Sequence, residues 1–210
     1  MVPLARSPAQ GEDRSDIQAY LSGDREAFDR LVLRHQDRVF NLCRRLLGDY
    51  GEAEECAQET FVKVFRSLAR FRLESGFTTW LYTIAVNTCR NRRSSTEYRF
   101  WNRVLRFGRN PQEEDDPPDI EIEDRTPSPL AQMAEKERDI MIQSAIDSLE
   151  HDHRTVLVLR HVEELPYEEI CKITGYNLGT LKSKLARARR RLQKKIEEIT
   201  RGNPDGMLSD

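Results

Sequence analysis

The chain has 210 residues, of which 34 are lysine or arginine and 36 are aspartate or glutamate, giving a formal net charge of -2. No run approaches the roughly 18 apolar residues of a membrane span, and the first ten residues lack the apolar core of a secretory signal. With ten glycines and nine prolines, the chain is neither fibrous nor wholly disordered. Its length suggests one large or two small domains.

Apolar residues at helical spacing predict four helices in the first half of the chain. A short helix is expected over residues 16–22, after a disordered segment 1–15. The second helix begins near Asp24, which can cap it, and ends at Gly48. The third is expected over about 52–70, with acidic residues in its first turns. The fourth follows a loop and carries Trp80, Leu81, Ile84, Ala85 and Cys89.

The middle of the chain is a linker by composition. Residues 110–129 hold five prolines, eight acidic residues and a single arginine. Such a segment cannot bury enough apolar surface to offset its ordering entropy, so we expect it to be extended and flexible.

Helical spacing resumes near Leu130, and the chain shows no convincing strand pattern. A helix-turn-helix is predicted about residues 167–186: Pro166 suits the start of a short helix, Gly175 ends it, and Asn177 can cap a long second helix. The inner face of this last helix is expected to contain Leu181, Leu185, Ala188, Leu192, Ile196 and Ile199. The fold class is therefore all-α.

Two basic blocks flank the acidic linker. Residues 87–109 carry seven arginines and one acidic residue, and residues 176–201 carry nine basic and two acidic residues. Blocks of this density are expected where a protein binds phosphate backbones. The alternative is a solvated helix face.

The four cysteines are far apart and form no C-x-x-C pair, and the four histidines complete no zinc-ligand pattern with them. The cysteines are Cys43, Cys56, Cys89 and Cys171. We expect them to be reduced and partly buried, with a redox switch as the lesser alternative. No metal site and no cofactor are expected.

Two segments resemble the extracytoplasmic-function (ECF) sigma factors, small bacterial initiation factors of the sigma-70 family. The stretch LVLRHVEELPYEEICKITGYNLGTLKSKLARARRRL resembles region 4, and GDREAFDRLVLRHQDRVFNLCRRLLG, AEECAQETFVKVFRSLARFR and FTTWLYTIAVNTCRNR resemble region 2. The resemblance implies region 2 at 16–95, a linker at 96–137, region 4 at 138–200 and a tail at 201–210.

The resemblance also implies a role for each surface. Residues 55–68 match the segment that binds core RNA polymerase on a coiled coil of the beta-prime subunit, with Glu55, Gln58, Glu59, Phe61, Val62, Phe65 and Leu68 as candidate residues. One departure is that Glu52-Ala53-Glu54-Glu55 replaces the family's frequent Asp-Ala-Glu-Asp. The charge is preserved. Without the resemblance, the acidic and aromatic residues of this helix still fit a partner-binding surface, and the alternative is an amphipathic bundle helix.

The segment 80–93 matches the part of the family that melts the duplex and captures the minus-ten element. Asn87 falls where ECF sigma factors hold a flipped base, and an amide can both donate and accept at a base edge. The other candidates there are Trp80, Tyr82, Arg90, Arg92 and Arg93. Trp80 and Tyr82 can stack on bases, but a core or supporting role is the stronger alternative for both.

The predicted helix-turn-helix points to the minus-thirty-five element, because an α-helix fits the major groove, where lysine and arginine donate to guanine. Its candidate residues are Thr180, Lys182, Ser183, Lys184, Ala186, Arg187 and Arg190. In the family the acidic linker threads toward the active-site cleft and RNA exit channel of the polymerase. A solvated spacer is an equal alternative here.

An enzyme is the weakest functional hypothesis, because no phosphate-binding loop, dinucleotide fingerprint, H-E-x-x-H or G-x-S-x-G motif is present. An independent helix-turn-helix regulator would leave residues 55–68 and Asn87 without a role, and a pure protein-interaction bundle predicts no dependence on DNA. The resemblance implies a cytoplasmic factor in stress-responsive transcription. Its partners would be the beta-prime and beta subunits of core polymerase, promoter DNA and an anti-sigma factor, which can hold it at the membrane. No small-molecule substrate is expected.

Overall fold

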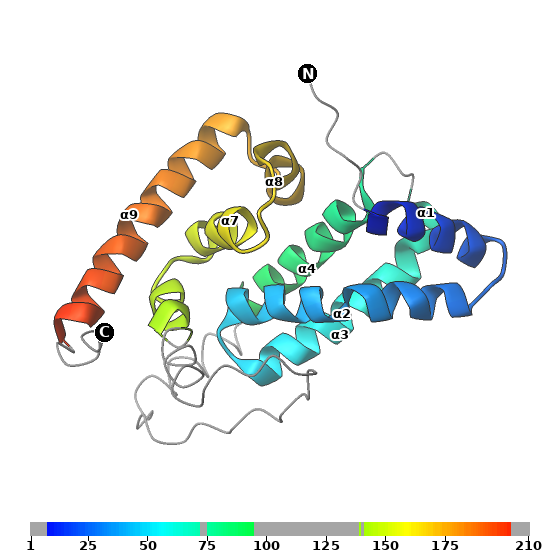
Figure 1. The fold of residues 1–210 in the computed structure, drawn as a ribbon, viewed down its shortest axis with the longest axis horizontal. Coiled ribbons are helices and arrows are strands. Elements are labelled where there is room, and N and C mark those ends of the chain that lie inside the picture. Colours follow the sequence, from blue (N-terminus) through cyan, green and yellow to red (C-terminus); the bar gives the residue numbers. More distant parts are fainter. Residues whose placement is uncertain (1–7, 72–74, 95–138, 140, 203–210) are drawn as a thin grey trace.

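The computed structural model describes residues 8–71, 75–94, 139 and 141–202, with the side chains of residues 8–10 and 202 left out. These residues form an all-helical fold in two halves (Figure 1). The predicted linker at 110–129, residues 95–109 of the first basic block and residues 130–138 lie outside the described ranges.

The first half is a helical bundle. It consists of α1 (Pro8–Leu21), α2 (Glu26–Leu47), α3 (Tyr50–Ser67), a short 3-10 helix η1 (Leu68–Arg70) and α4 (Phe77–Ser94). α2 packs against α1, α3 and α4, and α3 packs against α4. The core between them is apolar and includes Leu31, Val39, Leu42, Leu46, Val64, Leu81 and Ala85.

α1 begins at Pro8, so residues 8–15 are helical where the sequence analysis expects disorder. The physical reason is a set of ion pairs that short-range patterns do not reveal. The Asp13 carboxylate lies 2.8 Å from Arg34 and 2.9 Å from the buried ring of His35. Asp16 binds both Arg30 and Arg34 at 2.8 and 2.7 Å. Hydrogen bonds from these two arginines lower the pKa of Asp16 against the opposing effect of burial.

Local chemistry sets the junction between α2 and α3. Gly48 ends α2 with φ of 82°, a left-handed conformation that glycine adopts without a steric penalty. The next residue, Asp49, accepts a hydrogen bond from the Glu52 backbone N–H at 2.9 Å and so caps α3. This cap explains why α3 starts at Tyr50, two residues before the predicted start.

The second half contains a short helical segment at 141–147, then α7 (His151–His161), α8 (Tyr167–Thr174) and α9 (Leu178–Gly202). The predicted helix-turn-helix is confirmed in α8 and α9. Gly175 ends α8 with φ of 74°, and the Asn177 side chain accepts from the Thr180 backbone N–H at 2.8 Å. Leu181, Leu185 and Ala188 are buried under α9, and Leu192 packs at the edge of the core.

The two halves share one continuous core. α4 packs against α8, and the end of α2 packs against α7. Figure 1 shows α7 and α8 beside α4, whereas α9 lies on the far side of α7. The C-terminal half therefore covers one face of α4 with α8, lies against α2 with α7, and leaves much of α9 exposed.

Candidate nucleic-acid and partner interfaces

The candidate polymerase-binding residues lie along α3 and are not all available for contact. Glu55 and Gln58 are exposed, and Val62 and Phe65 are 46% and 52% exposed. Phe65 also makes edge contacts with Tyr20 and Phe28, at centroid distances of 6.0 and 5.1 Å. The result is an apolar patch with acidic residues on the same helix.

Two residues of the same candidate set face inward. Leu68 is 0% exposed in η1, so it supports the patch and cannot itself touch a partner. Phe61 is half-buried and packs against the core. The sequence pattern includes both because a residue that contacts a partner and a residue that packs against the core are equally apolar.

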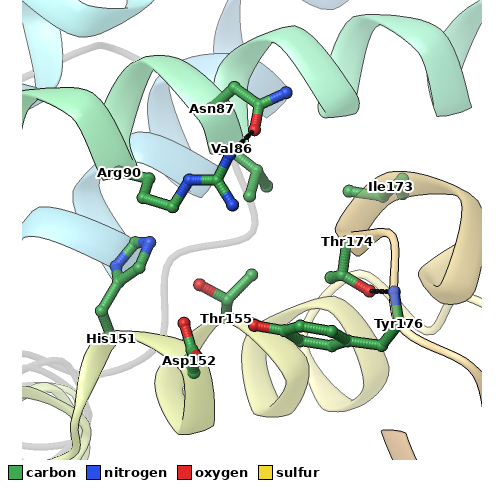
Figure 2. A pocket seen from close by; sticks show the side chains of 9 residues that line it. All are labelled: Val86, Asn87, Arg90, His151, Asp152, Thr155, Ile173, Thr174 and Tyr176. Carbon is green, nitrogen blue, oxygen red and sulfur yellow. Dashed lines mark hydrogen bonds between the residues drawn. The ribbon is translucent and has the colours of Figure 1, made fainter. Parts of the chain in front are cut away.

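The candidate minus-ten residues come from α4. Asn87 is half-buried, Arg90 is exposed, and the Arg90 guanidinium donates to Asn87 Oδ1 at 2.7 Å. Both residues line a small pocket that His151, Asp152 and Thr155 of α7 close from below (Figure 2). α8 and the turn after it close the pocket on another side.

Trp80 and Tyr82 have supporting positions in this structure. Trp80 is half-buried and stacks on Phe71 at 4.7 Å between centroids. Tyr82 is 1% exposed, and its hydroxyl donates to the Glu163 carboxylate at 2.5 Å. Burial raises the pKa of Tyr82, and the neighbouring carboxylate raises it further. A base cannot stack on Tyr82 while this contact exists.

Arg92 and Arg93 are both engaged within the chain. Arg92 lies 2.8 Å from Glu55 and 3.3 Å from Glu52, so it joins α4 to the acidic side of α3. Arg93 donates to the carbonyl oxygen of Leu46 at 3.2 Å. Among the candidate minus-ten arginines, Arg90 is the most exposed.

The candidate minus-thirty-five residues divide between two sides of α9. Lys182, Ser183, Ala186, Arg187 and Arg190 are exposed, opposite the buried Leu181 and Leu185. Lys184 instead turns toward α7, where it pairs with Asp152 at 2.7 Å and lies 5.0 Å above the Tyr176 ring. Thr180 is half-buried in the first turn.

Arg154 and Glu163 are important residues that the sequence analysis does not single out. The Arg154 side chain is 2% exposed, and it donates to the carbonyl oxygens of Leu46 and Asp147 at 2.8 and 2.6 Å. The sequence signal for the burial of Arg154 is its place at the start of an apolar segment, RTVLVLRH. Glu163 lies in the loop after α7, and no sequence signal links it to Tyr82.

The four cysteines are all free, as the sequence predicts. Cys43, Cys56 and Cys89 are buried and free, and Cys171 is half-buried and free. Contact with the Cys89 thiol, together with burial, raises the pKa of Cys56, so its reactive thiolate is disfavoured. No helix in the described ranges has the length and apolar character to cross a membrane, and no cluster within them could hold a metal ion.

Two segments of the chain match family descriptions: "Sigma-70 region 2" at residues 31–97 and "Sigma-70, region 4" at residues 139–192. The chain therefore belongs to the sigma-70 family, and the bundle and the helix-turn-helix are its region 2 and region 4.

Whole-chain relatives narrow this assignment. An RNA polymerase sigma-H factor of Pseudomonas aeruginosa is 34% identical over 203 residues, which are 91% of this chain and 97% of the relative. An ECF RNA polymerase sigma-E factor of Haemophilus influenzae is 32% identical over 194 residues, covering 89% and 96%. Within the sigma-70 family the chain is an ECF sigma factor: it acts in transcription initiation and is not an enzyme.

Solved structures support the fold. CnrH in complex with the cytosolic domain of CnrY has a TM-score of 0.62 and 22% identity, covering 89% of this chain and 98% of that one. The sigma factor RpoE of Bartonella quintana, in complex with the anti-sigma factor NepR, has a TM-score of 0.56 and 22% identity, covering 81% and 96%.

Proposed function

We propose that this sigma factor docks on the beta-prime subunit of core RNA polymerase through α3, captures the minus-ten element through α4 and reads the minus-thirty-five element through α9. The observation that carries the proposal is the exposed apolar pair Val62 and Phe65 on α3. A helix-turn-helix regulator that acts alone needs no exposed apolar patch beside Glu55 and Gln58, whereas such a patch is expected on a surface that binds a protein partner.

The minus-ten role is assigned to Asn87 and Arg90. The Asn87 amide can donate and accept at a base edge, which replaces hydrogen bonds that a flipped base loses. Arg90 is exposed beside it and can neutralise a phosphate. Trp80 and Tyr82 support α4 rather than contact the base.

The minus-thirty-five role is assigned to the exposed face of α9. Lys182 and Arg187 project from its N-terminal part, opposite the buried leucines, and have the chemistry that reads guanine in the major groove. Arg190 lies further along the helix, where contact with the phosphate backbone is expected. An anti-sigma factor is a further expected partner, as in the solved complexes of CnrH and RpoE.

A binding assay with core polymerase and no DNA tests the docking surface. Val62→Asp places a charge within the apolar patch and should weaken binding at least tenfold. The matched control is Leu178→Asp on α9, because Leu178 and Val62 are both 46% exposed. Equal binding by the two variants, with circular dichroism showing both folded, would contradict docking through α3.

A further inference from the structure

Three of the four cysteines meet in the core of region 2. Cys43 lies on α2, Cys56 on α3 and Cys89 on α4, and all three side chains are 0% exposed. These three helices pack against one another in pairs (Figure 1). The Cys89 thiol is in contact with the thiols of both Cys43 and Cys56. The three residues therefore form a thiol cluster with Cys89 at its centre.

Packing alone does not require sulfur at these positions. Small apolar side chains fill neighbouring positions of the same core, among them Ala53, Ala57 and Ala85. A single buried cysteine is equivalent to such a residue, because its thiol has no second thiol to react with. Two thiols in contact are different, since together they can lose two electrons and two protons and join as a disulfide.

The contacts within the cluster decide which thiol reacts first. Contact with the Cys89 thiol, together with burial, raises the pKa of Cys56, and contact with the Cys43 thiol raises the pKa of Cys89. Contact with Cys56 acts in the opposite direction and lowers the pKa of Cys89. When α3 and α4 separate locally, Cys56 therefore loses the main cause of its raised pKa, whereas Cys89 loses a contact that lowers its own. Since the thiolate is the nucleophile, Cys56 reacts first.

The edge between α3 and α4 beside Cys56 is held by ion pairs that water can reach. Arg92 of α4 lies 2.8 Å from Glu55 and 3.3 Å from Glu52 on α3, and the Glu55 side chain is 65% exposed. The charge of Arg92 also lowers the pKa of Cys56, which places this edge next to the thiol. Exposed ion pairs contribute little to stability, so these pairs resist a local separation of the two helices only weakly.

We propose that Cys56 and Cys89 form a redox modification site, at which a peroxide converts the two thiols to a disulfide that joins α3 to α4 within the folded bundle. The Cys56 thiolate attacks one oxygen of hydrogen peroxide, the O–O bond breaks, and the leaving hydroxide takes up the proton that Cys56 released. The Cys89 thiol then attacks the sulfenic sulfur of Cys56, and the sulfenic oxygen leaves as a second water. The two electrons lost by the thiols reduce the O–O bond, and a thiol reductant reverses the reaction.

Cys43 gives the cluster a second possible bond. It contacts Cys89 from α2, so it is the alternative partner of Cys89 when Cys56 is absent. Cys89 is common to both bonds. Loss of Cys89 therefore removes both of them, whereas loss of Cys43 leaves the Cys56–Cys89 bond intact.

The test treats the reduced full-length chain with hydrogen peroxide and blocks the remaining thiols with N-ethylmaleimide. Mass spectrometry then identifies linked peptides after tryptic digestion without reductant. Cys43, Cys56, Cys89 and Cys171 fall on four separate tryptic peptides, so each possible bond gives its own product. The matched control is Cys171→Ala, which removes one half-buried thiol on α8, outside the cluster.

We expect a Cys56–Cys89 link in the wild type and in the Cys43→Ala and Cys171→Ala variants, a Cys43–Cys89 link in Cys56→Ala, and neither link in Cys89→Ala. The oxidised wild type should also unfold at a higher urea concentration than the reduced protein, because the bond constrains the unfolded chain. Dithiothreitol should abolish this shift. Oxidation should be faster in urea below the unfolding transition, because local opening exposes Cys56.

Links that involve mainly Cys171, or links that form only in the fully unfolded chain, would overturn the site. A lower urea midpoint after oxidation would overturn the fit of the bond to the folded bundle. If circular dichroism shows Cys89→Ala to be unfolded, the change of partner in Cys56→Ala decides the result. None of these measurements uses polymerase or promoter DNA, so the result does not depend on the proposed function.

Discussion

Arg154 offers a direct measure of how strongly the two halves of the protein are joined. Its guanidinium is buried and donates to the Leu46 carbonyl of α2 and to the Asp147 carbonyl, and it pairs with the Asp147 carboxylate at 2.9 Å. The Leu46 carbonyl is one of the last four of α2, which have no partner within the helix. Replacement by methionine keeps the apolar stem and removes every donor.

The expected loss can be worked out from these contacts. Removal of one member of a buried ion pair destabilises a protein by about 3–5 kcal/mol. The Asp147 side chain is 37% exposed and retains a hydrogen bond from Gln143, so water and Gln143 compensate it in part. We therefore expect Arg154→Met to lower the free energy of unfolding by about 3 kcal/mol, at the lower end of that range.

Urea unfolding followed by far-ultraviolet circular dichroism measures this loss. The control is Arg160→Met on the same helix, whose guanidinium donates to the Leu165 carbonyl at 2.9 Å within region 4. That variant should lose about 1–2 kcal/mol, because it removes one hydrogen bond and the contact of the guanidinium with the Tyr167 ring at 5.2 Å. If Arg154→Met loses no more than Arg160→Met, Arg154 does not join the two halves as argued.

Two further predictions concern α9 and His151. Lys182→Ala or Arg187→Ala should change the sequence selected from randomised minus-thirty-five sites, at about 1–3 kcal/mol per lost contact. Arg190→Ala should instead weaken binding to all sequences and lower by about one the slope of the logarithm of the binding constant against the logarithm of the salt concentration. Identical sequences selected by the wild type and the Lys182 and Arg187 variants would contradict base reading. Burial lowers the pKa of His151 to about 4 from 6.5; Arg93, Arg154 and Arg90 add to this shift and Asp152 opposes it. Between these two pKa values the unfolded chain therefore binds a proton that the folded chain does not bind. The stability of the wild type should therefore fall by about 2 kcal/mol more than that of His151→Gln between pH 7 and pH 5 in urea titrations, and equal losses would contradict a half-buried, neutral His151.

The secondary structure was largely predictable because its determinants are local. Gly48 and Gly175 end helices where a left-handed residue is needed, and Asn177 caps α9. The start of α1 was not predictable, since Asp13 and Asp16 find their partners Arg30, Arg34 and His35 some 14 to 22 residues later, on another helix.

The candidate surfaces were predictable as helix segments but not as individual side chains. Lys182 and Lys184 are both lysines of one basic run, yet only the fold shows that Lys184 pairs with Asp152 of α7. The same is true of Arg90 and Arg92, because the acidic partners of Arg92 lie on α3. Composition gives the charge of a helix, and tertiary structure decides which charges remain available to a partner.

The cover over α4 also has a consequence for newly synthesised protein. Tyr82 and its acceptor Glu163 are 81 residues apart in the chain. At ribosomal rates of about 5–20 residues per second, roughly 4–16 seconds separate the synthesis of these two residues. During that interval the first bundle can already fold, and its Tyr82 and Val86 have no intramolecular cover. A nascent chain therefore leaves this face of α4 uncovered until its own C-terminal half has been synthesised.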